Sequence, residues 1–134
     1  MTVCLPEVRK RFADDLYATQ TTGIEIVEVG ELYAKCMLHL AAKHKNAMGA
    51  VMGGVLYTLA DFAFAVAANY DTLTTVSISG DIKFLSASKS DVLYAMARCV
   101  KNGKANCFFD VDIVDGYDKL IAKASIVGAK INAK

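Results

Sequence analysis

One stretch of the sequence decides the fold, and it is residues 53 to 69, which read GGVLYTLADFAFAVAAN. A helix drawn through these residues is apolar on nearly every side, which is typical of a helix enclosed on most of its circumference. Asp61 stands near the middle of the stretch. A charge in that position argues against a membrane span. We therefore expect a buried helix in a soluble protein.

The residues on either side of this helix predict an antiparallel sheet. Before it, the spacing of apolar residues predicts an amphipathic helix from Leu5 to Leu16 and two strands, Gly23 to Val29 and Glu31 to Leu40. After it, we expect a meander of four strands, at residues 74–86, 92–101, 105–115 and 119–130, with hairpin signals at Asn102-Gly103 and Asp115-Gly116. A sheet of this length buries one face by curling around the apolar helix. The expected class is α+β, and the arrangement is a hot-dog fold.

Length and composition limit the organisation of the protein. A chain of 134 residues fits one domain, and we expect residues 1–134 to form it. Its apolar fraction of 54% is high for a small soluble monomer and indicates that some apolar surface is buried against another copy. Fifteen basic and fourteen acidic residues are scattered along the chain, so nothing indicates binding to nucleic acid or to an anionic membrane.

Several classes of site have no support in the sequence. The four cysteines lack metal-ligand or redox-pair spacing, so we expect reduced thiols and no metal. No nucleotide-binding motif is present, and no cofactor is expected. The N-terminus lacks the pattern of a signal peptide, which makes the cytoplasm the expected location.

Asp61 is the residue that a purely structural interpretation explains least well. An unpaired buried carboxylate costs several kcal/mol or becomes neutral, so cores rarely keep one without a partner or a purpose. Asp61 could instead lie on a small exposed edge of the helix or at a subunit boundary. The functional interpretation is a catalytic carboxylate, because perturbed carboxylates in apolar surroundings are more frequent at active sites.

Gly53 and Gly54 lie where the helix should begin. The free N–H groups of a first helical turn point outward, and glycine lets a ligand approach the backbone closely. The Gly53 N–H could polarise a thioester carbonyl as its oxygen gains charge. The same glycines could also serve only a tight entry into the helix. Asn46 before the helix and Ser77 after it could hold a carbonyl or a water, although both residue types are common in turns and on strand surfaces.

Residues 46 to 61, NAMGAVMGGVLYTLAD, closely resemble the motif N-x-x-G-x-x-H-G-G-x-x-x-x-L-x-D of the phenylacetate-degradation (PaaI-like) type of hot-dog acyl-CoA thioesterases. The resemblance continues through residues 75–78 and 82–89 and covers about half of the chain. It implies hydrolysis of acyl-CoA to the free acid and CoA, without specifying the acyl group.

The resemblance also implies a role for each site residue. Asp61 would be the nucleophile or the general base, the Gly53 N–H would polarise the carbonyl, Asn46 would orient the thioester or the water, and Ser77 would help to place that water. In the family the sites lie at a dimer interface. Asn46 and Gly53 would then come from one subunit and Asp61 and Ser77 from the other, in a homodimer or a homotetramer.

One position departs from the motif. Met52 stands where the family has His, and it can neither donate the imidazole hydrogen bond nor titrate. Met52 and Gly54 could line the substrate site, since a flexible Met suits an apolar acyl chain. The resemblance favours Lys89 for the phosphates of CoA. His39 and His44 have no carboxylate at a spacing that indicates a triad, and we interpret them as a strand-face residue and a loop contact.

Two other functions compete with the thioesterase. Met52 could mark a non-catalytic acyl-CoA-binding module, although such a module gains nothing obvious from the carboxylate of Asp61. A hot-dog dehydratase or hydratase would use a His on or near the central helix, and this helix has none.

Overall fold

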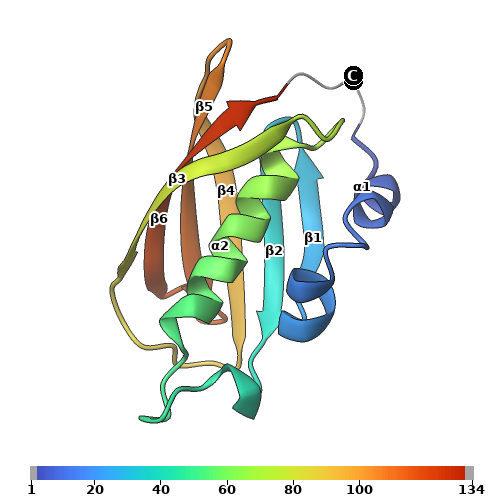
Figure 1. Ribbon diagram of the computed structural model, residues 1–134. Helices are drawn as coiled ribbons and strands as arrows, with labels where there is room; N and C mark the ends of the chain where they lie inside the picture. Colours follow the sequence, from blue (N-terminus) through green and yellow to red (C-terminus); the bar gives the residue numbers. More distant parts are fainter. Residues whose placement is uncertain (1–2, 132–134) are drawn as a thin grey trace.

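The long apolar helix lies against one face of a curved, six-stranded antiparallel sheet in a computed structural model that describes residues 3–131 (Figure 1). In chain order the elements are α1 (Leu5–Arg11), the π-helix η1 (Tyr17–Thr22), β1 (Glu25–Gly30), β2 (Tyr33–His39), the 3-10 helix η2 (Ala42–His44), α2 (Gly53–Ala68), β3 (Thr75–Phe84), β4 (Val92–Asn102), β5 (Asn106–Asp115) and β6 (Leu120–Lys130). This arrangement agrees with the α+β class and with the helix enclosed by a sheet that the sequence predicts.

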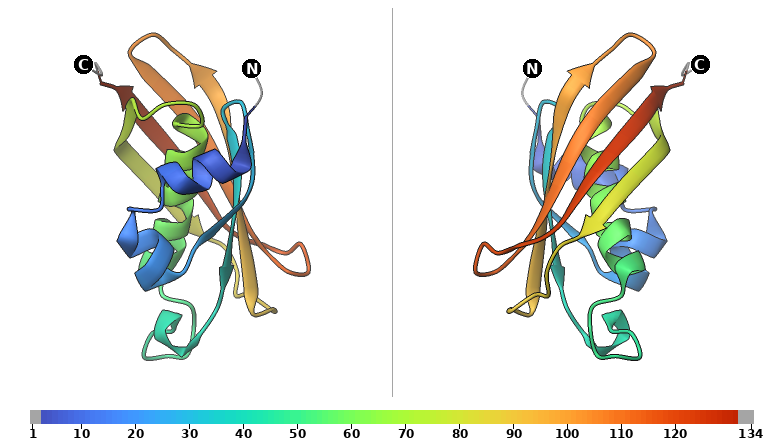
Figure 2. Two further views of the ribbon diagram at one scale, coloured as in Figure 1. Left: turned by 90° about the vertical axis from the view of Figure 1, so that its right-hand side faces the viewer. Right: turned by 90° about the vertical axis from the view of Figure 1, so that its left-hand side faces the viewer.

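The strand order leaves β3 at one edge of the sheet. The order is β1-β2-β4-β5-β6-β3, and every neighbouring pair is antiparallel. Within the described residues β3 pairs only with β6, so its other edge carries unpaired backbone groups. The expected meander of four strands is therefore wrong for its first strand, because β4 pairs with β2 and leaves β3 to close on β6. The N-terminal segment lies along α2 on the side of the helix away from the sheet (Figure 2).

Small residues let α2 approach the sheet closely. Ala95 and Ala97 on β4 and Ala122 and Ala124 on β6 are buried under the helix. Larger side chains fill the space that remains, and the rings of Phe64 and Phe109 meet edge to face with centroids 5.2 Å apart. Burying a side chain of this size contributes about 1.5–3 kcal/mol. The predicted enclosure of the helix is confirmed.

The end of α2 is fixed by the side chain of Asn69. Its Oδ1 accepts the N–H groups of Thr74 and Thr75, and its Nδ2 donates to the carbonyls of Ala65 and Thr75. This amide therefore joins the last turn of α2 to the start of β3. The four bonds satisfy buried backbone groups that would otherwise lack partners.

Two local predictions are wrong in detail. The first helix ends at Arg11 rather than Leu16, because the backbone of Phe12 leaves the helical region with φ of −99° and ψ of 4°, while its ring packs edge to face on Phe62. A turn at residues 12–14 and the unpredicted η1 follow, and we call residues 12–22 the N-terminal arm. The β4–β5 hairpin has three loop residues, 103–105, rather than the two-residue turn expected at Asn102-Gly103.

No helix within residues 3–131 is long and apolar enough to cross a membrane.

Candidate active site

One narrow stripe of α2 remains open. It carries Gly54, Tyr57, Thr58, Asp61 and Ala65, which are partly or fully exposed, while the rest of the helix after its first turn is buried. Positions three and four residues apart share one face of a helix. The stripe lies between β3 on one side and the N-terminal arm on the other (Figure 1). Every polar side chain of α2 is on this stripe.

Asp61 lies half-buried in the middle of the stripe. Burial raises the pKa of its carboxyl above the ordinary value, a hydrogen bond from the Ser77 side chain lowers it, and the charge of Asp15 raises it further. The net direction is upward. A carboxylate with a raised pKa is a stronger proton acceptor than an exposed one. The structure therefore brings Asp61 and Ser77 together.

Tyr57 stands one turn before Asp61 and closes the β3 side of the stripe. Its hydroxyl occupies the space that a Cβ at Gly80 would fill, so glycine at that position lets the ring lie on β3. The pKa of Tyr57 is raised by burial and by the charge of Asp61. The hydroxyl therefore keeps its proton, and it lies against Gly80.

A hollow opens on the other side of Asp61, and we call it the Asp61 hollow. Its volume is about 380 Å³, and its walls are residues 15–18 of the N-terminal arm and the face of α2 from Tyr57 to Ala65. The sequence does not predict this contact, because residues 15–18 are more than forty positions away from Asp61 and no motif links the two segments.

The first turn of α2 leaves a backbone donor free. Val55 and Leu56 donate their N–H groups to the carbonyl of Met52, whereas Gly53 N–H has no acceptor within residues 3–131. The ring of Phe84 lies against Gly53, where a Cβ would come within 2.9 Å of Cζ. Gly54 is exposed, and its carbonyl accepts the Thr58 hydroxyl at 2.8 Å.

Asn46 is already engaged by its own loop. Its Oδ1 accepts the N–H groups of Met48 and Ala50 at 3.0 and 3.1 Å, and the turn that it closes places Gly49 in the left-handed region with φ of 80°. Only the Nδ2 amide group is left for a ligand among the described contacts. Asn46 can therefore act as a donor to a carbonyl, and its orientation is fixed by the loop.

His44 fixes the same loop from inside. It is buried, its Nδ1 accepts Ala41 N–H at 2.9 Å, and its Nε2 lies 2.8 Å from the Thr22 carbonyl. Because Nδ1 accepts, Nε2 carries the proton and donates it to Thr22. The His44 carbonyl accepts the N–H of Met52 at 2.9 Å. The interpretation of His44 as a loop contact agrees with these bonds, and Met52 itself is 53% exposed at the helix start.

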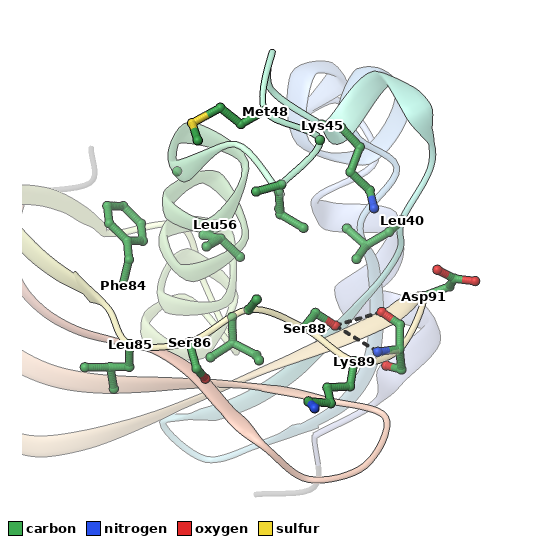
Figure 3. A pocket seen from close by; sticks show the side chains of 17 residues that line it. Leu40, Lys45, Met48, Leu56, Phe84, Leu85, Ser86, Ser88, Lys89 and Asp91 are labelled. Carbon is green, nitrogen blue, oxygen red and sulfur yellow. Dashed lines mark hydrogen bonds between the residues drawn. The ribbon is translucent and has the colours of Figure 1, made fainter.

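A second and larger space, the Gly53 cavity, lies at the N-terminal end of α2. It has a volume of about 790 Å³ and lies between the loop that precedes α2 and the loop that follows β3 (Figure 3). Lys45 and Lys89 are on facing sides of it, and Asp91 is nearby. The predicted Lys89 therefore belongs to the same space as Gly53.

Asp115 holds the Lys89 loop in place. Its carboxylate is buried and accepts the N–H groups of Lys89, Tyr117 and Lys119 at 2.8 to 3.0 Å. The Lys89 N–H is the main reason why the pKa of Asp115 lies below its ordinary value. The sequence shows Asp115 only as the start of a turn, so this tertiary role was missed.

Within one chain the two halves of the predicted site are separate. Asp61 borders the hollow and Ser77 lies beside it on β3, whereas Gly53 and Lys89 border the cavity. Asp61 lies eight positions after Gly53 on the helix, which corresponds to about 12 Å along the axis. Among residues 3–131 no group of three or more His, Cys, Asp or Glu side chains could hold a metal ion.

Known proteins resemble this chain in both sequence and structure. The family model of the thioesterase superfamily matches residues 48–122. Acyl-coenzyme A thioesterase PaaI of Escherichia coli K12 is 34% identical over 101 residues, which is 75% of this chain and 72% of the relative.

Solved structures agree with this match. The structure of the E. coli PaaI protein superimposes with a TM-score of 0.85 at 27% identity and covers 98% of this chain and 99% of its own. A hypothetical thioesterase protein from Streptococcus pneumoniae TIGR4, crystallised with coenzyme A, gives a TM-score of 0.81 at 25% identity over 92% of this chain and 99% of its own. The predicted hot-dog fold and enzyme class are confirmed, and the chain belongs to the thioesterase superfamily, with PaaI-like proteins as its relatives.

Proposed function

We propose that the protein hydrolyses acyl-CoA thioesters to the free acid and CoA. The observation that carries the proposal is Asp61, a half-buried carboxylate of raised pKa beside Ser77, on the only open stripe of α2 within the described residues. A carboxylate in this environment is suited to take a proton from water or to attack a carbonyl carbon. The PaaI relative supports CoA as the thiol component.

Two routes are compatible with this arrangement. In the first, Asp61 accepts a proton from water while the water oxygen attacks the thioester carbon. The resulting oxyanion accepts a hydrogen bond from the Gly53 N–H. The C=O bond of the intermediate then re-forms and the C–S bond breaks. The leaving CoA thiolate takes the proton from Asp61. In the second, an oxygen of Asp61 attacks the same carbon, the thiolate leaves, and water hydrolyses the mixed anhydride.

The other predicted residues complete the site around the reacting carbon. The free amide of Asn46 would donate to the thioester or to the water, and the Ser77 hydroxyl would place the water beside Asp61. Met52 and Gly54 would line the entry to the oxyanion position. Lys89 would meet the phosphates of CoA at the mouth of the Gly53 cavity, since it is one of the residues that line this space.

A second copy of the chain would bring the two halves of the site together. The ten residues of β3 form an unpaired sheet edge, and its Val76 and Ile78 are exposed. Long apolar edges of this kind pair readily with another strand. In a homodimer, or a homotetramer built from two dimers, Asn46 and Gly53 of one copy would face Asp61 and Ser77 of the other.

Free-thiol release tests the proposal. The purified protein and its Asp61→Ala variant are compared on benzoyl-, phenylacetyl-, short-chain and long-chain acyl-CoA. We expect at least one class to be hydrolysed and kcat of the variant to fall at least about a hundredfold, the scale of a lost acid-base group. If neither protein hydrolyses any ester while both bind one equally, the chain is an acyl-CoA-binding module and the proposal is wrong.

A further inference from the structure

One wall of the Gly53 cavity is a loop without regular structure. This loop, the Lys89 loop, comprises residues 85–91 between β3 and β4, and every one of its residues borders the cavity (Figure 3). A surface loop of this kind has many conformations unless other parts of the chain restrain it. The position of Lys89 in the cavity wall therefore depends on what holds its loop.

The turn between β5 and β6 supplies restraints on this loop. Residues 116–119 form the turn, directly after Asp115 at the end of β5. Three hydrogen bonds join the turn and the loop: Lys119 Nζ to the Ala87 carbonyl at 3.0 Å, Gly116 N–H to Ser90 Oγ at 2.7 Å, and Lys89 N–H to Asp115 Oδ2 at 2.8 Å. The turn is thus bound along the middle of the loop.

The two carboxylate oxygens of Asp115 have different partners. Oδ1 accepts the N–H groups of Tyr117 and Lys119 at 2.9 and 3.0 Å, and these bonds close the turn itself. Oδ2 accepts the N–H of Lys89 and ties the loop to the turn. A carboxylate can accept at both oxygens, whereas the amide of Asn accepts at one end and donates at the other. The bond to Lys89 therefore requires the carboxylate.

We propose that Asp115 is a positioning residue of the thioesterase proposed above, and that its Oδ2 holds Lys89 where the ammonium group meets the phosphates of CoA. This role rests on the proposed function of Lys89. Within residues 3–131 Asp115 is not among the residues that line the cavity, so it acts on the substrate only through the loop. Its loss should weaken the binding of the phosphate-bearing part of CoA and leave the chemical step at Asp61 unchanged.

Asp115→Asn separates the two tasks of the carboxylate. The amide oxygen can keep the N–H groups of Tyr117 and Lys119, and the NH2 group then faces the Lys89 N–H, so that the bond to the loop is lost. Asp118→Asn is the matched control. It removes the same charge from the same turn, on an exposed residue whose φ of 64° is one that Asn adopts readily.

Ser90→Ala reaches the same loop through another bond and decides the question if Asp115→Asn does not fold. The Ser90 hydroxyl accepts the Gly116 N–H at 2.7 Å and donates to the Val92 carbonyl at 2.9 Å. Lys89→Ala removes the ammonium group itself. Asp115→Asn is studied alone and in combination with Lys89→Ala, since the combination shows whether the two residues act through each other.

Two measurements are made on each folded variant. Calorimetry gives Kd for CoA and for pantetheine, which has the thiol arm of CoA but none of its phosphates. Thiol release gives kcat and KM for the acyl-CoA that the wild type hydrolyses fastest. A change that only lowers stability alters neither Kd nor KM of the folded fraction, so these values separate positioning from a purely structural role.

The expected pattern has three parts. Asp115→Asn raises Kd for CoA and KM at least about threefold, the scale of one exposed charge pair, while kcat and Kd for pantetheine stay within about twofold. Lys89→Ala gives the same pattern, and adding Asp115→Asn to it changes nothing further, because both act through one ammonium group. Ser90→Ala gives a smaller change in the same direction, and Asp118→Asn gives none.

Three other results overturn the role of Asp115. The carboxylate serves only the fold if Asp115→Asn weakens CoA and pantetheine equally or leaves both unchanged. The two residues are independent if the effects of Asp115→Asn and Lys89→Ala add in full. Lys89 does not meet the phosphates if the wild type binds CoA no more tightly than pantetheine. In each case hydrolysis of an ester by the wild type keeps the thioesterase proposal, whereas the expected Kd pattern without any hydrolysis keeps the role of Asp115 and removes the enzyme.

Discussion

The two sides of α2 differ in burial and in polarity. On the side toward the sheet, Leu59, Ala60 and Ala63 have no exposed surface, and the packing leaves no room for a polar group. On the other side, Asp61 and Tyr57 are partly open and close to Ser77 and Gly80 of β3. One helix of 16 residues thus supplies both the centre of the core and the candidate catalytic group. Adjacent positions on it should therefore respond to mutation in opposite ways.

The largest effect is expected for Asp61→Asn, with kcat lower by about 10²–10⁴-fold and stability unchanged or higher. Burial raises the pKa of Asp61, so the folded protein disfavours the charged form compared with the unfolded chain. Above this raised pKa the charge destabilises the fold, and the penalty disappears as pH falls below the ordinary Asp pKa. Thiol release and urea unfolding at neutral pH measure the two quantities. An active variant would remove Asp61 from the mechanism.

Leu59→Ala, two residues earlier, should have the opposite effect, with lower stability and little change in kcat. Leu59 is fully buried between α2 and the sheet, and removing such a side chain costs about 2–5 kcal/mol of unfolding free energy. The catalytic stripe is untouched, so kcat should be largely retained at temperatures where the variant is folded. Chemical denaturation and thiol release on the same sample test this. Loss of kcat in a fully folded Leu59→Ala protein would contradict the separation of the two sides.

The sequence predicted the core side of α2 more fully than its open side. A long apolar helix must be covered by other elements, so the enclosing sheet followed from residues 53 to 69 and the flanking strand patterns. The strand order did not follow, because the expected meander would place β3 beside β4, whereas β3 pairs with β6. Asp61 was found because a carboxylate is conspicuous in that run. The arm was not found, because Leu16 continues the apolar spacing of a helix that in fact ends at Arg11. Only tertiary packing of Phe12 on Phe62 moves Leu16 from the predicted core to the edge of the Asp61 hollow.

Ile78→Lys tests whether the open side needs a second copy. Ile78 is 59% exposed on the unpaired edge strand β3, so a charge there should cost the single chain little and should weaken dimerisation at least about tenfold. We expect activity to fall in parallel as the protein is diluted. Val100→Lys is the control, since Val100 is equally exposed but lies on β4, inside the sheet. Light scattering after gel filtration measures the mass. A monomeric Ile78→Lys protein with full activity would contradict a shared site.

The smallest effect is expected for Asp15→Asn on the pH dependence of kcat/KM for a neutral ester. Burial is the main cause of the raised pKa of Asp61, Ser77 opposes it, and the negative charge of Asp15 adds to it. Removing that charge favours the ionised form of Asp61, so its pKa falls and the acidic limb of the profile moves to lower pH. The plateau at higher pH should change little, because Asp61 is ionised there in both proteins. High salt should shift the wild-type limb in the same direction, since Asp15 is exposed and its field is screened. Two outcomes would contradict this: an acidic limb that moves to higher pH, or a plateau that drops as it does for Asp61→Asn. Either would show that Asp15 acts on the reaction directly rather than through the pKa of Asp61.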